Sequence, residues 1–261
     1  MKYFSDTWAE LWYEDSMWPS IEALHALLYE GPLILKPVKD ADKDAEAAFA
    51  AHGFRLYPTV LRTTLFYDER SDCFFKMLHP IGIKKMILFA FTGTAHRIFR
   101  LSRQLSEQGI TVPEVTAYGR IRDGNIPLFA MRRAQGRSLY DLLIKEGKTL
   151  PADLCLTVIA AVTRFHRAGF WFGDAHLSHI FTDGFAVTGF IDIDSIRRNW
   201  RKGIRNYAKD LAGLNHPRLP LTGDKKQELL YHYVKTMGIP DAEDFLEAVT
   251  YYSERRWKRQ T

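Results

Sequence analysis

The sequence predicts an α+β fold with two lobes, a small β-rich lobe followed by a larger, mainly helical lobe. From Tyr57 to Leu78, two runs rich in β-branched and aromatic residues flank the polar turn DERSD, which is typical of a β-hairpin. Residues 112–133 repeat this pattern around the turn RDGN. After Gly136 the longer segments instead carry apolar residues at helical spacing. This change of character places the boundary between the lobes near Met131–Gly136.

The elements follow in order along the chain. Residues 1–50 are expected to be a helical and loop-like N-terminal extension, with Ser20 as a cap of the first helix. Residues 51–132 are expected to form the β-rich lobe, which includes one internal helix that ends at Gly109. Residues 133–261 are expected to form the helical lobe. Its predicted helices are SLYDLLIKEG, PADLCLTVIAAVTRFHRAG, GDKKQELLYHYVKTMG and DAEDFLEAVTYYSERRWKR.

Composition indicates an ordinary globular protein. The chain has 261 residues, of which 46% are hydrophobic and 26% are charged, so it can bury a substantial core. The two cysteines, Cys73 and Cys155, lack metal-ligand spacing, which argues against a zinc site or a disulfide framework and favours a reducing compartment. The longest apolar runs, MILFAF and LCLTVIAAV, are far shorter than the ~20 residues that span a bilayer. We expect a cytoplasmic protein, peripheral to a membrane at most.

Charge gives a second constraint. The formal net charge is +5, and much of the excess lies in residues 197–209 and 254–260. Such stretches attract nucleic acid, acidic lipid or phosphorylated sugars, although each can equally be a solvated face.

Two groups of carboxylates indicate where chemistry could occur. Asp174 lies in a polar loop, and Asp192 and Asp194 end an apolar run. Two short strands joined at Asp183-Gly184 connect the groups. The arrangement suggests a site that holds a cation and handles a proton, and the alternative is that these aspartates only shape turns.

The segments FHRAGFWFGDAHLSHIF (165–181) and GFIDIDSIRR (189–198) resemble the bacterial lipopolysaccharide core kinases. In that family, a helix ending in H-x-x-G leads to H-G-D-L-H-x-x-N-I-L and then to a strand ending in I-D-x-D. The similarity runs from about Tyr57 to Lys235. It implies a protein-kinase-like fold and phosphorylation of Kdo or heptose in the lipopolysaccharide inner core.

The resemblance also implies roles for individual residues. Asp174 matches the carboxylate that orients the acceptor hydroxyl and accepts its proton. Asp192 matches the metal-binding aspartate, and Lys76 matches the lysine that pairs with the α- and β-phosphates of ATP. The backbone from Met131 to Arg133 matches the hinge that meets adenine. We expect Asp174, Asp192 and Lys76 to converge on one cleft.

Two further residues match supporting positions in the family. Asp210 matches a helix aspartate that accepts hydrogen bonds from the catalytic-loop backbone. His176 is expected to order the same loop. The second acid of I-D-x-D is Asp194, whose role is structural in this interpretation.

Three departures from the family pattern weaken the case for catalysis more than the case for the fold. His179 replaces the asparagine that completes the metal site, and an imidazole suits Mn²⁺ or a transition ion better than Mg²⁺. Residues 56–72 contain no glycine, so backbone amides cannot approach phosphates as in a glycine-rich loop. Ile98 stands about where a glutamate should pair with Lys76.

Three functions remain open at this point. The first is a kinase that uses ATP with Mg²⁺ or Mn²⁺ on an anionic glycolipid or sugar, with the basic segment after Asp194 against the substrate or the inner-membrane surface. The second is a pseudokinase that binds a nucleotide or a partner without turnover. The third, a nucleic-acid binder, has only charge in its favour and is not expected.

Overall fold

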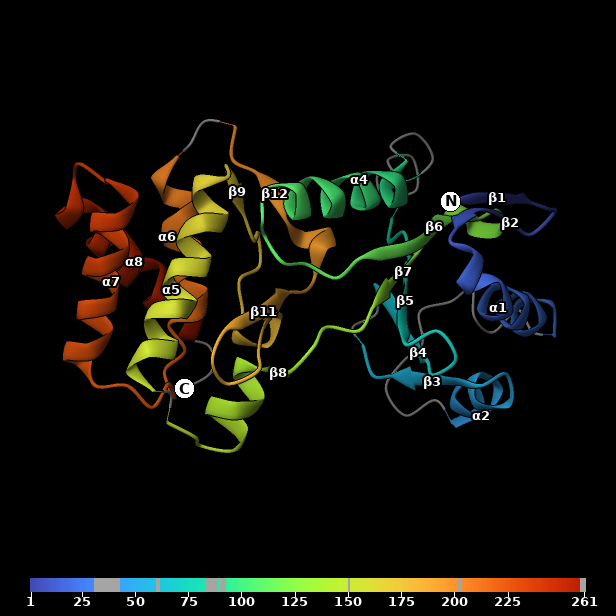
Figure 1. The fold of residues 1–261 in the computed structure, drawn as a ribbon, viewed down its shortest axis with the longest axis horizontal. Helices are drawn as coiled ribbons and strands as arrows, with labels where there is room; N and C mark the ends of the chain where they lie inside the picture. The colour runs from blue at the N-terminus through green and yellow to red at the C-terminus, as the bar shows by residue number, and fades with distance from the viewer. Residues whose placement is uncertain are drawn as a thin grey trace. The chain divides into compact units, whose positions relative to one another are not determined.

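The structure is a computed structural model that describes residues 1–30, 43–59, 62–82, 89, 93–149, 151–200 and 203–258. The chain divides into two compact units. Unit 1 comprises Met1–Gln104 and Pro113–Arg133, and unit 2 comprises Leu105–Val112 and Ala134–Thr261. Strands β1 to β7 lie in unit 1 and helices α5 to α8 lie in unit 2 (Figure 1). The predicted α+β class is therefore confirmed.

Unit 1 is built on an antiparallel sheet with seven described strands in the order β1-β2-β6-β7-β5-β4-β3. The first predicted hairpin is β4 and β5, in which Thr63 pairs with Leu78. The second is β6 and β7, so both predictions are confirmed. The strands are β1 (Lys2–Ser5), β2 (Ala9–Tyr13), β3 (Phe54–Tyr57), β4 (Thr63–Asp68), β5 (Cys73–Leu78), β6 (Val115–Ile121) and β7 (Ile126–Arg132).

The N-terminal residues differ from the prediction of helix and loop alone. Lys2–Ser5 and Ala9–Tyr13 form strands, and β2 joins the sheet beside β6. Burial alternates along β2 because one of its faces meets the core. Helices α1 (Trp18–Glu30) and α2 (Lys43–Ala51) were predicted, and their apolar residues share one core with the sheet. The first part of the chain is thus an integral part of unit 1.

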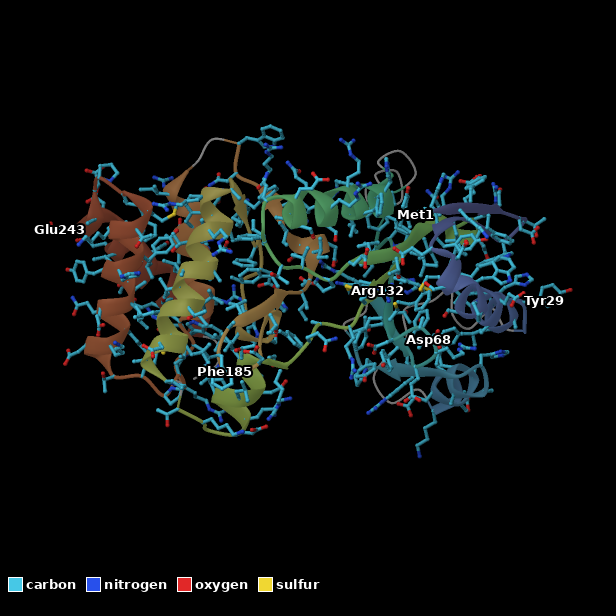
Figure 2. The ribbon with its side chains drawn as sticks, in the orientation of Figure 1. Met1, Tyr29, Asp68, Arg132, Phe185 and Glu243 are labelled. Atoms are coloured by element: carbon cyan, nitrogen blue, oxygen red, sulfur yellow. The ribbon has the colours of Figure 1, made fainter. Side chains whose placement is uncertain are left out.

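Ser20 is a correction to the predicted helix cap. Its side chain is buried within α1 and donates a hydrogen bond to the carboxylate of Asp68. Asp68 is labelled in Figure 2, and it also accepts hydrogen bonds from Arg70 Nε (2.7 Å) and Ser71 Oγ (2.9 Å). A serine 48 positions away therefore supplies a hydrogen bond to a buried carboxylate at the end of β4, and Arg70 supplies the compensating charge.

Helix α4 (Thr94–Glu107) confirms the internal helix predicted for the β-rich region. Ile98 is fully buried, and the Phe99 ring stacks on Tyr118 of β6 at a centroid distance of 4.5 Å. The apolar run MILFAF lies mostly outside the described residues.

Unit 2 is mainly helical, as predicted, and α6 packs on α8 while α5 packs on α7 (Figure 1). Its helices are α5 (Ala152–Arg167), α6 (Ile204–Leu214), α7 (Gly223–Met237) and α8 (Ala242–Trp257), with a short π-helical turn at Asp141–Lys145. Its strands are β8 (Arg137–Ser138), β9 (Phe170–Trp171), β10 (Ile180–Thr182), β11 (Val187–Phe190) and β12 (Arg197–Arg198). In the part of the chain that the structure describes, no helix has the length and apolar character needed to cross a membrane.

Candidate active site

A buried carboxylate supports the polar loop that carries Asp174. Asp210 of α6 is 1% exposed, and its Oδ2 accepts hydrogen bonds from the Phe172 amide (2.6 Å) and from His166 Nε2 (3.2 Å). The predicted role of Asp210, an acceptor for the loop backbone, is confirmed. The loop is therefore fixed to a helix at the residue two positions before Asp174.

The tautomer of His166 follows from its two neighbours. The Asp210 carboxylate can only accept, so His166 Nε2 carries the proton that it donates at 3.2 Å. Burial raises the pKa of Tyr233, so its hydroxyl remains protonated and can donate to His166 Nδ1, which lies 2.7 Å away. The Tyr207 hydroxyl donates to the His166 carbonyl at 2.9 Å, and the two rings stack at 4.4 Å. Sequence reasoning missed both tyrosines, since neither has a spacing that links it to His166.

Gly173 sets the backbone path into Asp174. Its φ is +77°, a conformation that side-chain-bearing residues rarely adopt, and an added Cβ would overlap the Ser195 carbonyl oxygen. The Asp174 side chain is 67% exposed, and its Oδ1 accepts a hydrogen bond from Arg256 Nη2 of α8 at 2.8 Å. The loop thus presents this carboxylate to solvent, where a substrate hydroxyl could reach it.

His179 lies in the same loop and forms a hydrogen bond with the backbone of Asp174. Its Nδ1 lies 3.0 Å from the Asp174 carbonyl oxygen. A carbonyl only accepts hydrogen bonds, so Nδ1 must carry a proton, and Nε2 of the neutral ring then keeps its lone pair. The imidazole can therefore brace the loop with one nitrogen and offer the other to an electrophile or a metal ion.

Asp192 has a backbone conformation that is unusual for its residue type. Its φ of 64° and ψ of 44° place it in the left-handed region, two residues after the end of β11. The Ile191 amide donates to the His179 carbonyl (2.9 Å), and Ser195 donates to the Asp192 carbonyl from both its amide (3.0 Å) and its hydroxyl (2.8 Å). Non-glycine residues held in this region concentrate at functional sites. The backbone thus ties the segment of Asp192 to that of His179.

His176 orders the loop, as predicted. Its Nδ1 lies 2.7 Å from Ser178 Oγ and accepts the Ser178 amide at 3.2 Å. Burial, followed by the positive charge of neighbouring groups, lowers the pKa of His176 to about 4. The ring is therefore neutral at physiological pH and acts as a fixed acceptor.

The residues predicted to contact the nucleotide lie in unit 1. Burial alternates along β5, so Lys76 lies on the face opposite to Phe75. Met131 is buried opposite Phe74. The Arg133 amide donates to the Asp72 carbonyl at 3.0 Å, so this particular donor is already engaged. The convergence of Lys76 with Asp174 and Asp192 stays a prediction.

Asp192 and His179 are the residues predicted to bind a divalent metal ion. In the described part of the chain, no group of three or more His, Cys, Asp or Glu residues is arranged to hold a metal. Asp192 offers carboxylate oxygens, and His179 offers one imidazole nitrogen. Ions that act on nucleotides are commonly held by one or two carboxylates together with phosphates and water, and the Asp192 side chain is of this donor type. That Asp192 and His179 hold one ion together stays a prediction. The imidazole favours Mn²⁺ over Mg²⁺.

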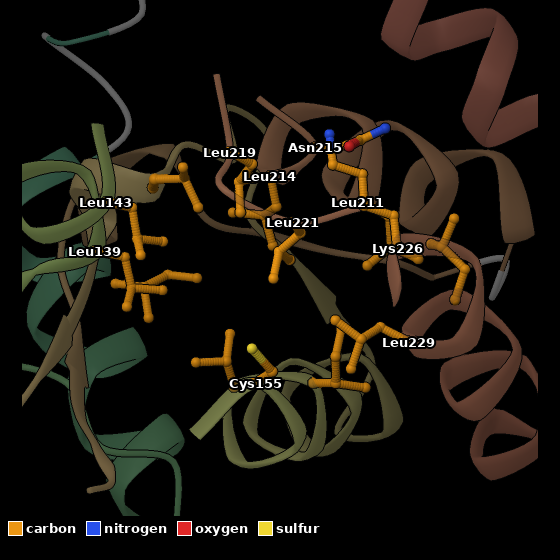
Figure 3. A pocket seen from close by; sticks show the side chains of 15 residues that line it. Leu139, Leu143, Cys155, Leu211, Leu214, Asn215, Leu219, Leu221, Lys226 and Leu229 are labelled. Carbon is orange, nitrogen blue, oxygen red and sulfur yellow. The ribbon is translucent and has the colours of Figure 1, made fainter. Parts of the chain in front are cut away.

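A separate apolar pocket lies within unit 2 (Figure 3). Side chains from α5, α6 and α7 line it together with residues outside these helices such as Leu139 and Leu143, and the lining includes Cys155 and Lys226. Burial raises the pKa of the Cys155 thiol and lowers that of Lys226. A protonated thiol is a poor nucleophile, and the lining offers few groups that could bind a sugar.

Comparison with known families decides the relationship. The model of the lipopolysaccharide kinase (Kdo/WaaP) family matches residues 83–233, more than half of the chain. The chain belongs to this family. The matched residues include Asp174, His179 and Asp192 but neither Lys76 nor Arg256. The family predicted from the sequence is confirmed, while the predicted roles of the individual residues stay predictions.

Solved structures give more distant similarities. A co-crystal structure of WbdD with a kinase inhibitor is 16% identical, with a TM-score of 0.47, and the match covers 78% of this chain and 46% of that chain. A structure described as the bifunctional kinase-methyltransferase WbdD is 15% identical, with a TM-score of 0.46, and the match covers 74% of this chain and 47% of that chain. Vaccinia related kinase 3 is 14% identical, with a TM-score of 0.39 and coverage of 76% and 72%. The chain spans about half the length of the WbdD chains. No curated protein matches it.

Proposed function

We propose that this chain is a kinase that transfers the γ-phosphoryl group of ATP to a hydroxyl of the lipopolysaccharide inner core, on Kdo or heptose. Residues 51–132 and 133–261 would serve as its two lobes. The observation that carries the proposal is the loop at 172–179, which exposes the Asp174 carboxylate while His179 binds the Asp174 carbonyl. Membership of a lipopolysaccharide kinase family supports the same reaction and the same class of acceptor.

Asp174 would act on the acceptor hydroxyl. Its exposed carboxylate would accept a hydrogen bond from the hydroxyl, aim the oxygen at the phosphoryl group and take up the proton as the new bond forms. Phosphoryl transfer depends mainly on positioning, so the backbone of this residue must be held firmly. The buried network of Asp210 and His166 would supply that rigidity.

Asp192 and Nε2 of His179 would hold a divalent ion, Mg²⁺ or Mn²⁺. When bound, such an ion would neutralise the negative charge of the ATP phosphates. Lys76 would pair with the α- and β-phosphates of ATP. The backbone near Met131 and Arg133 would meet adenine, through groups other than the Arg133 amide, because that amide already binds Asp72.

The acceptor is expected to be an anionic sugar or glycolipid, and the chain could reach it at the inner-membrane surface. Arg197, Arg198 and Trp200 follow the candidate metal ligand Asp192, and Trp200 is 80% exposed. The Arg198 guanidinium lies 4.7 Å from the centre of that ring. Exposed arginines beside an aromatic ring suit the anionic boundary of a membrane.

A pseudokinase is the second candidate. Ile98 is fully buried in α4 and offers no carboxylate to Lys76. His179 replaces the oxygen ligand that Mg²⁺ prefers. Both observations favour a protein that binds a nucleotide or a partner without turnover.

One experiment separates the two candidates. Purified protein is incubated with ATP, Mg²⁺ or Mn²⁺ and delipidated inner-core oligosaccharide, and the product is detected by mass spectrometry. The kinase predicts a metal-dependent phosphorylated sugar. Saturable nucleotide binding without any product, in either metal, would instead establish the pseudokinase.

A further inference from the structure

An open hollow of about 670 Å³ adjoins the Asp174 loop within unit 2. The loop contributes Gly173 and Ala175, the residues on either side of Asp174. The remaining walls come from α6 and from the end of α8, through Lys209, Asp210, Tyr252, Arg255, Arg256 and Lys258. The hollow is therefore next to the position that a substrate hydroxyl would occupy.

Tight packing holds these walls together. An added Cβ on Gly213 would overlap the Ala175 carbonyl oxygen and lie 3.1 Å from Arg256 Nη1. Only glycine lets α6 meet both groups this closely, although glycine inside a helix costs about 1 kcal/mol relative to alanine. Trp257 anchors the end of α8, since its buried indole Nε1 donates to the Ala212 carbonyl at 3.0 Å.

Positive charge dominates the lining. Lys209, Arg255, Arg256 and Lys258 contribute four cations, of which Arg256 pairs with Asp174 (2.8 Å) and Lys258 pairs with Glu254 (3.5 Å). Among the described residues of the lining, the one carboxylate is Asp210, which is buried and already accepts two hydrogen bonds. The hollow thus has the charge and the donor groups to bind an oxyanion.

The dipole of helix α8 accounts for only some of the four cations that line the hollow. Cations in the last turn of a helix stabilise its dipole, which accounts for Arg255 and Arg256 at the end of α8. Lys209 belongs to α6, so the dipole of α8 does not account for it. Its ammonium lies 5.4 Å from the ring centre of Tyr252 in α8. Arg256 also reaches out of its own helix to Asp174.

We propose that this basic hollow binds a carboxylate or phosphate group of the acceptor sugar, and that Arg256 links this group to Asp174. The inference rests on the proposed kinase function and adds to it a second point of recognition. A guanidinium can donate to two oxyanions at once, so Arg256 can hold the Asp174 carboxylate and the substrate anion together. Acceptors that carry a negative group beside the reacting hydroxyl would be selected over neutral sugars.

Direct binding of small sugars to the 261-residue chain tests the hollow without ATP. The probes are glucose 6-phosphate, glucuronate and neutral glucose, measured by titration calorimetry at low salt. We expect both anions to bind more tightly than glucose, and the tighter of the two identifies the preferred group. Lys209→Gln and Arg255→Gln should each weaken anion binding by about tenfold, the effect of losing one charge-assisted contact.

The matched control is Lys235→Gln, which removes one positive charge from an exposed position at the end of α7. It should leave anion binding unchanged. Equal affinity for all three probes, or equal effects of the three substitutions, would overturn the proposal. A third outcome would also overturn the proposal. If no sugar anion binds the parent protein, and the two substitutions instead weaken its binding to phosphatidylglycerol vesicles, the hollow binds lipid and not the acceptor sugar.

Failure of the anion-binding proposal can be distinguished from failure of the kinase proposal. If anions bind with the expected pattern but no acceptor is phosphorylated, the hollow stands and the kinase function fails. If phosphoryl transfer occurs and Lys209→Gln and Arg255→Gln leave the acceptor KM unchanged, the kinase function stands and the hollow fails.

Discussion

Removing the Asp210 carboxylate should destabilise unit 2 severely. Asp210→Ala would leave the Phe172 amide and His166 Nε2 without their acceptor in a buried position. Each of the two stranded donors costs about 1–3 kcal/mol, or about 2–6 kcal/mol for both. We therefore expect the free energy of unfolding to fall by about 2–6 kcal/mol, a large part of the 5–15 kcal/mol that is typical of a domain.

Urea denaturation measures this change. Tryptophan fluorescence and far-UV circular dichroism are recorded together, because two compact units need not unfold in one step. Asp210→Asn retains one acceptor oxygen and should cost less than Asp210→Ala. Glu247→Ala, on the exposed face of α8, serves as the control and should stay within about 0.5 kcal/mol of the parent. An Asp210→Ala protein within about 1 kcal/mol of the parent would refute the support network.

The other predictions concern pH, packing and metal. Burial lowers the pKa of His79 from 6.5 to about 4, so only the unfolded chain is protonated between these values. His79 should thus raise the free energy of unfolding by up to roughly 3 kcal/mol from pH 4 to pH 6.5, and His79→Gln should remove this contribution in urea melts while the contribution of His176 remains. Gly213→Ala should cost about 1–3 kcal/mol, measured in the same way, because its Cβ meets Ala175 and Arg256. His179→Asn should improve Mg²⁺-dependent nucleotide binding, and the absence of any metal dependence in both proteins would rule out the enzymatic role of His179.

Local patterns made much of the fold predictable. The β4–β5 and β6–β7 hairpins have strong strand residues around polar turns, and α5 has long helical periodicity. The strands β10 and β11 were predicted from the Asp183-Gly184 turn, where Asp183 Oδ1 accepts two backbone amides. In these segments the information lies within a few neighbouring residues.

The failures involve partners that are distant in sequence. Strand β2 was missed because it is short and carries the apolar Trp12 on its less buried face. It is fixed by pairing with β6, more than a hundred residues later. Ser20 was predicted as a cap, but its partner is Asp68. The contact of Arg256 with Asp174 spans 82 positions, and the C-terminal arginines are equally consistent with a solvated face. No local spacing encodes such contacts.

Asp174 is the residue on which the proposed function depends. The decisive measurement is a single-turnover assay of phosphoryl transfer from radiolabelled ATP to inner-core oligosaccharide, with nucleotide affinity determined in parallel. Asp174→Ala should leave nucleotide affinity nearly unchanged and slow transfer by about 10²-fold or more, the usual contribution of a positioned base. Transfer at the parent rate in Asp174→Ala would contradict the assignment of this carboxylate as the proton acceptor.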